Sequence, residues 1–187
     1  MPKRANHCLF PNFAEKTLAQ TSIGSYSMPL EVYLQSAIVR GILVTNQDRL
    51  SNYLILREGE EVFTLRDAQL TDLRGKTMDL NADQFTIYLH QVYAIADLSP
   101  LFRADRSGLE HLYIRKDQSR VVLGVGPFWV RGNIHLIPGT VIHDLLLAKT
   151  MFIPVTNAIM LDGGESEPRT YLINRRQISC LTGLGED

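Results

Sequence analysis

Short runs of apolar and β-branched residues recur along the chain, with turn-forming residues between them. The apolar runs are Val32–Thr45, Gly59–Leu70, Phe85–Ala96, Arg120–Ile137, Met151–Leu161 and Arg169–Leu181. The turn signals are Asn46–Asp48, Pro138–Gly139 and Asp162–Gly164. Six short strands at hairpin spacing predict a mainly β fold built from two small barrels.

Two short segments have a different period. Their apolar residues fall at positions i, i+3 and i+4, which are Leu50, Tyr53, Leu54 and Ile142, Leu145, Leu146. Asp48 and Thr140 stand where an N-cap is expected. The spacing predicts a short helical turn in each segment, with a continuous strand over Leu50–Leu56 as the alternative.

Four blocks of the sequence recur, in the same order, at a spacing near 90 residues. Val39–Gly41 recurs as Val130–Gly132, and three further blocks follow in the same order. This collinearity predicts an internal duplication, with Gly41 and Gly132 at sharp bends of a strand. We expect one barrel over residues 1–98, opened by a short helix in Phe13–Ser22, and a second over residues 99–187.

The duplication also predicts the core and the connection between the copies. Ser99–Gly108 is the best linker, and Glu110–Arg115 could form the first strand of the second copy. The predicted core residues are Val39, Ile42, Leu54, Phe63, Leu65, Ile95, Val130, Ile134, Leu146, Phe152, Val155 and Leu181.

Composition narrows the class of protein. The 187 residues are 45% hydrophobic and 21% charged, as in soluble globular proteins, and 19 basic against 20 acidic residues leave a net charge of −1. No run approaches the 18 apolar residues of a membrane span. Two cysteines, Cys8 and Cys180, form no disulfide framework, and no apolar signal segment follows Pro2–Arg4. We therefore expect a cytoplasmic protein.

Val39–Leu43 has the pattern hydrophobic-x-Gly-x-Leu, and Asp48 is followed four residues later by Asn52. In both features the first copy resembles the Sm and Lsm family of small β-barrels, in which that pattern belongs to the bent strand and an Asp/Asn pair follows it. The resemblance implies a small barrel and edge-to-edge assembly, and two such barrels in one chain are similar to uncharacterised bacterial proteins. The late Arg-Gly or Lys-Gly dipeptide of the RNA-binding members is replaced here by Leu89–Val92 or Arg175–Ile178.

Motifs for catalysis or cofactor binding are weak. His135, His143 and Asp144 are the only local set of metal-ligating types, and no further ligands follow at a recognisable spacing. Gly124–Gly126 lacks the third glycine of a dinucleotide cradle and is better explained as a strand bend before Trp129. We expect no catalytic residue, no metal and no cofactor, hence a protein that is not an enzyme.

Two functions remain open. Fourteen of the 19 basic residues are arginine, so an RNA or single-stranded nucleic-acid binder could use Arg66, Arg74, Arg175 and Arg176. Tyr33, Tyr88 or Tyr93 would then serve as stacking platforms. The favoured alternative is a non-enzymatic binding or assembly module.

The assembly hypothesis rests on an unprotected strand. Gln177–Leu181 carries no lysine, glutamate or proline, the residues that usually guard a sheet edge. We therefore predict a homo-oligomer or a protein partner, with Ile178, Ser179 and Cys180 at the interface, or else the counterpart strand Val92–Ala96.

Overall fold

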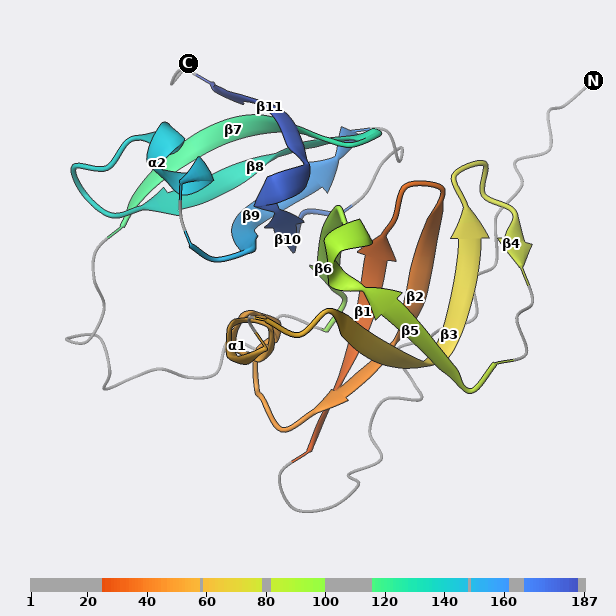
Figure 1. The fold of residues 1–187 in the computed structure, drawn as a ribbon. Coiled ribbons are helices and arrows are strands. Elements are labelled where there is room, and N and C mark those ends of the chain that lie inside the picture. Colours follow the sequence, from red (N-terminus) through yellow and green to blue (C-terminus); the bar gives the residue numbers. More distant parts are fainter. Residues whose placement is uncertain are drawn as a thin grey trace, which may run out of the picture.

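The computed structural model describes residues 25–57, 59–78, 82–99, 116–147, 149–161 and 167–184. These residues form one open antiparallel sheet of eleven strands with two short α-helices (Figure 1). The mainly β class is therefore confirmed, whereas the sheet is continuous where two separate barrels were expected. The predicted helix in Phe13–Ser22, the linker at Ser99–Gly108 and the strand Glu110–Arg115 lie wholly or almost wholly outside the described residues.

The first half of the molecule, residues 25–99, contains six strands. In chain order the elements are β1 (Tyr26–Tyr33), β2 (Ala37–Thr45), α1 (Leu50–Leu56), β3 (Val62–Asp72), β4 (Thr77–Met78), β5 (Gln84–Tyr88), the 3₁₀ turn η2 (Leu89–Gln91) and β6 (Ala94–Asp97). The order of pairing is β6-β1-β2-β3, and β3 pairs with both β4 and β5.

The second half, residues 116–184, repeats this order without a counterpart of β4. Its elements are β7 (Asp117–Val125), β8 (Phe128–Leu136), α2 (Ile142–Leu146), β9 (Phe152–Met160), β10 (Arg169–Asn174), the 3₁₀ turn η5 (Arg175–Gln177) and β11 (Ile178–Gly183). The order of pairing is β11-β7-β8-β9-β10. Pairing of β10 with β6 joins the two halves into one sheet.

Four of the six predicted strands contain a break that the sequence pattern did not reveal. Val32–Thr45 turns at residues 34–36 between β1 and β2, and Arg120–Ile137 turns at residues 126–127 between β7 and β8. A 3₁₀ turn divides Phe85–Ala96, and another divides Arg169–Leu181. Each turn lies between two apolar strands, so hydrophobicity alone does not mark it.

Both predicted helical turns are confirmed as α1 and α2. The helices begin one residue later than expected, with Arg49 and Val141 as N-caps. Asp48 accepts a hydrogen bond from the Asn52 side chain, and Thr140 donates to the Ile137 carbonyl, so both polar groups close local turns. None of the helices in the described ranges is long and apolar enough to cross a membrane.

The bent strands have the same local geometry in each half. Asp67 in β3 and Asn157 in β9 adopt left-handed φ angles of 49° and 48°. The ladders β2–β3 and β8–β9 shift register close to these bends. A Cβ added to Gly41 would lie 3.0 Å from the Leu65 Cβ, and one added to Gly132 would lie 2.5 Å from the Ala158 Cβ. Glycine is needed at both positions because the neighbouring strand passes so close.

The core consists of two clusters, one in each half. Eight of the twelve predicted core residues are buried and the other four are half-buried. Strands at the joint supply side chains to both clusters: Leu172 of β10 packs in the first, and Tyr33 of β1 packs in the second. The predicted boundary at residue 98 directly follows β6, which pairs with β10 across the joint.

Candidate functional site

The two halves meet where β6 pairs with β10, a contact called here the internal junction. Ala94 lies opposite Ile173, Ile95 opposite Leu172 and Ala96 opposite Tyr171. β6 also pairs with β1, so both of its sides are occupied. The predicted use of Val92–Ala96 as an external contact is therefore wrong, because this strand already connects the two halves.

A buried amide fixes the end of the internal junction. The Asn174 side chain, fully buried, donates from Nδ2 to the Val92 carbonyl at 2.8 Å and to the Leu89 carbonyl at 3.4 Å. Its Oδ1 accepts from the Arg176 backbone N–H, and its own N–H donates to the Tyr93 carbonyl. One side chain thus satisfies backbone groups from both halves, which a buried polar residue must do to be stable.

A buried carboxylate lies at the other end of the internal junction. Glu31 in β1 accepts hydrogen bonds from Arg40 Nε at 3.2 Å and Nη2 at 2.8 Å, and Arg169 Nη1 of β10 approaches it to 3.5 Å. Its side chain is only 5% exposed, while those of the two arginines are about one-third exposed. The ion pairs therefore join three strands and compensate the cost of burying the carboxylate.

Two tyrosines pack beside this cluster. Their ring centroids, in Tyr33 and Tyr171, lie 5.9 Å apart, and the Tyr33 ring also meets Phe128 of the second half edge to face. Burial, followed by the negative charge of Glu31, raises the pKa of Tyr33 well above its ordinary value. Burial likewise raises the pKa of Tyr171. Both phenols stay protonated at neutral pH and serve as packing groups.

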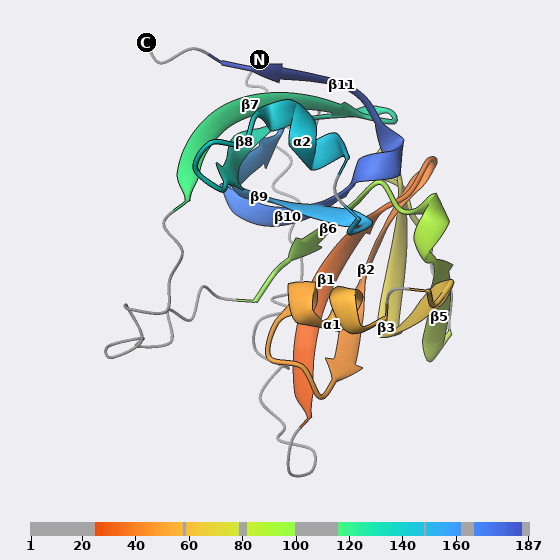
Figure 2. The same ribbon diagram turned by 60° about the vertical axis from the view of Figure 1, so that its left-hand side comes forward.

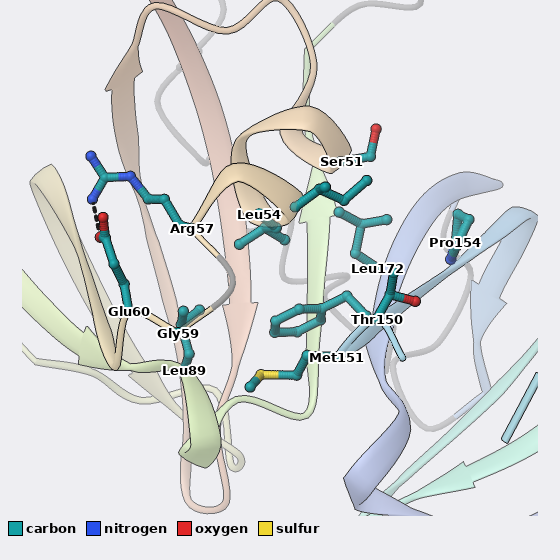
Figure 3. Close-up of a pocket in the computed structure, with 12 residues that line it drawn as sticks. Ser51, Leu54, Arg57, Gly59, Glu60, Leu89, Thr150, Met151, Pro154 and Leu172 are labelled. Carbon is teal, nitrogen blue, oxygen red and sulfur yellow. Dashed lines mark hydrogen bonds and ion pairs between the residues drawn. The ribbon is translucent and has the colours of Figure 1, made fainter. Parts of the chain in front are cut away.

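A cavity of 160 Å³ opens beside the internal junction (Figure 3). It lies between α1 and the start of β9, and most of its lining is apolar. The lining residues include Leu54, Ile55, Leu89, Met151, Phe152 and Leu172. The charged residues among the described lining are Arg57 and Glu60, which form an ion pair with each other at the rim. The cavity is thus a seam between α1 and the second half.

Among the described strands three lie at an edge of the sheet: β11 in the second half, and β5 and the two-residue β4 in the first, both beside β3. Among the described strands, β11 pairs with β7 alone and β5 pairs with β3 alone. Neither Gln84–Tyr88 nor Ile178–Gly183 contains a charged residue or a proline. Both edges therefore offer backbone hydrogen-bonding groups without the usual protection.

Backbone alternation identifies the groups that face outward. The Leu184 N–H donates to the Arg120 carbonyl of β7. Backbone groups alternate in direction along a strand, so those of Leu181 and Gly183, three residues and one residue before Leu184, point away from β7. On the other edge, the Leu89 N–H donates to the Glu61 carbonyl. By the same alternation, the N–H and C=O of Thr86 point away from β3.

The predicted interface residues lie on the open edge of β11. Ile178 is half-buried, whereas Ser179 and Cys180 are exposed. A register irregularity falls between Ile178 and Cys180, and the Ser179 hydroxyl donates to the Gly124 carbonyl of β7. Ser179 is thus engaged with its own neighbour, and the regular part of the edge begins at Cys180.

The four predicted nucleic-acid contacts are spread over three elements. Arg66 lies in β3, Arg74 in the β3–β4 turn, and Arg175 and Arg176 in η5. Arg175 donates to the carbonyls of Thr150 and Leu146, each at 3.0 Å, so it secures the segment between α2 and β9. This arginine has a structural role that its sequence context did not indicate.

The other candidate groups are also engaged locally. Tyr33 is buried and Tyr93 half-buried, which leaves Tyr88 as the exposed member of the three proposed stacking platforms. His135 hydrogen-bonds Thr156 across the β8–β9 ladder, and Asp144 accepts the Val141 N–H. The described part of the chain holds no cluster of three or more His, Cys, Asp or Glu side chains suited to a metal ion.

Gly124–Gly126 lies at the end of β7 and in the turn to β8, so the predicted bend within one strand is a hairpin turn between two. Gly126 has a φ of +58°, and a Cβ there would lie 2.2 Å from the Tyr93 ring. Both the backbone conformation and the close approach of the ring require glycine.

Sequence reasoning missed the residues that build the internal junction. Glu31 interrupts the apolar residues Leu30 and Val32, and Asn174 directly follows the apolar run Tyr171–Ile173; a polar residue beside such neighbours was the available signal. The open edge β5 was missed because Phe85–Ala96 was predicted as one strand. Comparison of the chain with protein-family models, with curated proteins and with solved structures found no match.

Proposed function

We propose that this protein is a non-enzymatic assembly module that associates with further copies of itself through β5 and β11. The observation that carries the proposal is that β5 and β11, in different halves of one continuous sheet, carry no charge and pair with one neighbour each among the described strands. The internal junction supports it, because the same kind of antiparallel strand contact already holds the two halves together. An open edge gains hydrogen bonds when another strand pairs with it.

We further propose that each half is a small barrel of the Sm-like kind and that the two arose by internal duplication. The shared order of strands, the left-handed residues Asp67 and Asn157 and the close-packed Gly41 and Gly132 support this interpretation. A cytoplasmic location, with no cofactor, belongs to the same proposal. The exposed thiol of Cys180 fits a reducing compartment.

Light scattering at tens of micromolar tests the proposal directly. The wild-type chain should have a mass above 21.1 kDa that increases with concentration. Thr86→Pro removes an outward N–H from the edge and should lower the mass to that of the monomer, because a proline cannot donate to a new ladder. Thr86→Val keeps that N–H and should still assemble. A wild-type monomer across this range would overturn the proposal.

A further inference from the structure

We infer that α2 docks on β3 and β5 of a second copy, in the way that α1 contacts the second half within the chain. This inference rests on the proposed association through β11 and β5 and adds detail to it. It assigns a helix, a register and a direction to the contact. The two copies use different surfaces, so the contact is head-to-tail and each copy keeps one edge for the next.

The equivalence of the two halves supplies the geometry. Superposing the strand order places β11 on β6 and β5 on β10, with Leu181 at the position of Ile95 and Thr86 at that of Leu172. Within the chain, Ile95 lies opposite Leu172. The same contact between two copies therefore places Leu181 opposite Thr86.

The backbone groups are complementary in this register. Leu181 on β11 and Thr86 on β5 both direct their N–H and C=O toward the open side, as the alternation along each ladder requires. A register shifted by one residue would bring an outward pair against an inward one and lose these hydrogen bonds. Cys180 then lies opposite Ile87, and Thr182 opposite Phe85.

The helices give a second, independent observation. α1 buries Leu50, Tyr53 and Leu54, whereas α2 has no buried residue although its sequence has the same apolar spacing. Leu54 and Ile55 of α1 line the cavity against β9 and β10. Their counterparts are Leu146, the last residue of α2, and its C-cap Leu147, whose side chain is 72% exposed against 55% for Ile55.

The position of α2 is suitable for this contact. It lies on the outer side of the second half, away from α1, near β11 (Figure 2). A Cβ added to Gly183 of β11 would lie 3.1 Å from Ile142 Cδ1 of α2, so helix and edge are adjacent. A strand that pairs with β11 therefore passes close to the helix.

The receiving face is more polar than its counterpart inside the chain. Val62, Thr64 and Thr86 occupy the positions of Phe152, Pro154 and Leu172. Less apolar area is available there, so the contact between copies should be weaker than the internal junction and reversible. The charges at this contact are complementary. Arg40 and Arg169 meet at Glu31 in the internal junction, and their counterparts are the exposed Arg131 of one copy and the exposed Asp83 of the next, which carry opposite charges.

The test compares Leu147→Glu with the matched variant Ile55→Glu by sedimentation velocity over a concentration series. Leu147→Glu should weaken self-association severalfold, because a charge replaces a leucine that the contact would partly cover, as the second half partly covers the 55% exposed Ile55. Ile55→Glu should leave association unchanged, because the counterpart contact of Ile55 lies within the chain. Thr86→Leu, which copies Leu172, should tighten association severalfold.

The outcomes separate this inference from the proposed function. Association that resists Leu147→Glu but is lost in Thr86→Pro would refute the docking of α2 and leave edge pairing intact. Equal weakening by both glutamate variants would also overturn the inference, since α1 would then lie in the contact. A monomeric wild-type chain would refute both. Circular dichroism of each variant confirms that it is folded.

Discussion

The two short helices hold the same place in the order of strands but differ in burial. α1 buries three side chains, and α2 buries none. The strand β9 of the second half lies beside α1 and forms one wall of the cavity with it. The difference teaches that a helix at this position depends on a neighbouring unit for part of its burial. The second half provides that neighbour for α1 at the internal junction.

The largest expected effect comes from removing the carboxylate that the internal junction contains and the open edges lack. Glu31→Val copies Val122, the residue at the matching position of β7. It removes the ion pairs that the carboxylate makes with Arg40 and Arg169 across three strands and should lower the free energy of unfolding by about 3 kcal/mol. Urea denaturation measures this loss.

Arg169→Leu is the matched control for Glu31→Val. Arg40 still pairs with the carboxylate in that variant, so the loss should be smaller. A cost below about 1 kcal/mol for Glu31→Val would show that the cluster does not stabilise the junction.

A smaller difference separates the two bent strands. Gly132→Ala should cost about 2 kcal/mol, because its Cβ would lie 2.5 Å from the Ala158 Cβ and 2.8 Å from Val155 Cγ1. Gly41→Ala should cost about 1 kcal/mol, since its nearest neighbours would be 3.0 Å away. Thermal unfolding of both variants gives the comparison, and a greater loss for Gly41→Ala would contradict it.

The buried phenol at the internal junction predicts a pH dependence. Because burial raises the pKa of Tyr33, the folded chain keeps a proton that the unfolded chain loses above about pH 10. The contribution of this phenol to the free energy of unfolding should be complete below that pH and fall as the pH rises. Tyr33→Phe should make this fall less steep by about 1 kcal/mol per pH unit between pH 10 and 11.5. Equal slopes for the variant and the wild type would contradict the prediction.

The smallest effect is electrostatic and concerns the register between copies. Arg131→Asp and Asp83→Arg should each weaken association by about 0.5 kcal/mol at low salt, as expected for an exposed pair. The double variant exchanges the charges and should restore association. Sedimentation at two salt concentrations measures both. If the two losses in association free energy add in the double variant, Arg131 and Asp83 do not contact each other.

Local features of the fold could be predicted from the sequence. The helical turns at Leu50 and Ile142 and the bends at Gly41 and Gly132 depend on residue spacing and on glycine, which the sequence displays directly. The turn at residues 34–36 could not be found, because Leu34, Gln35 and Ser36 include neither glycine nor proline.

The candidate site was harder to predict because it depends on pairing across the chain. β6 and β10 lie more than 70 residues apart in sequence, and a ladder between them leaves no periodic signal in either strand. The exposed strand β11 was found from its lack of charge. Its complement β5 was hidden in an apolar run that a 3₁₀ turn divides.

The central claim is that β5 and β11 are complementary to each other, and a mixing experiment tests it most directly. Thr86→Pro blocks β5 and leaves β11 open, whereas Gly183→Pro blocks β11 and leaves β5 open. Each variant alone should be monomeric at tens of micromolar by light scattering. An equimolar mixture should form a dimer with twice the 21.1 kDa mass of the chain, because each variant retains the edge that the other lacks. A mixture that remains monomeric, or a single variant that still assembles fully, would contradict the account.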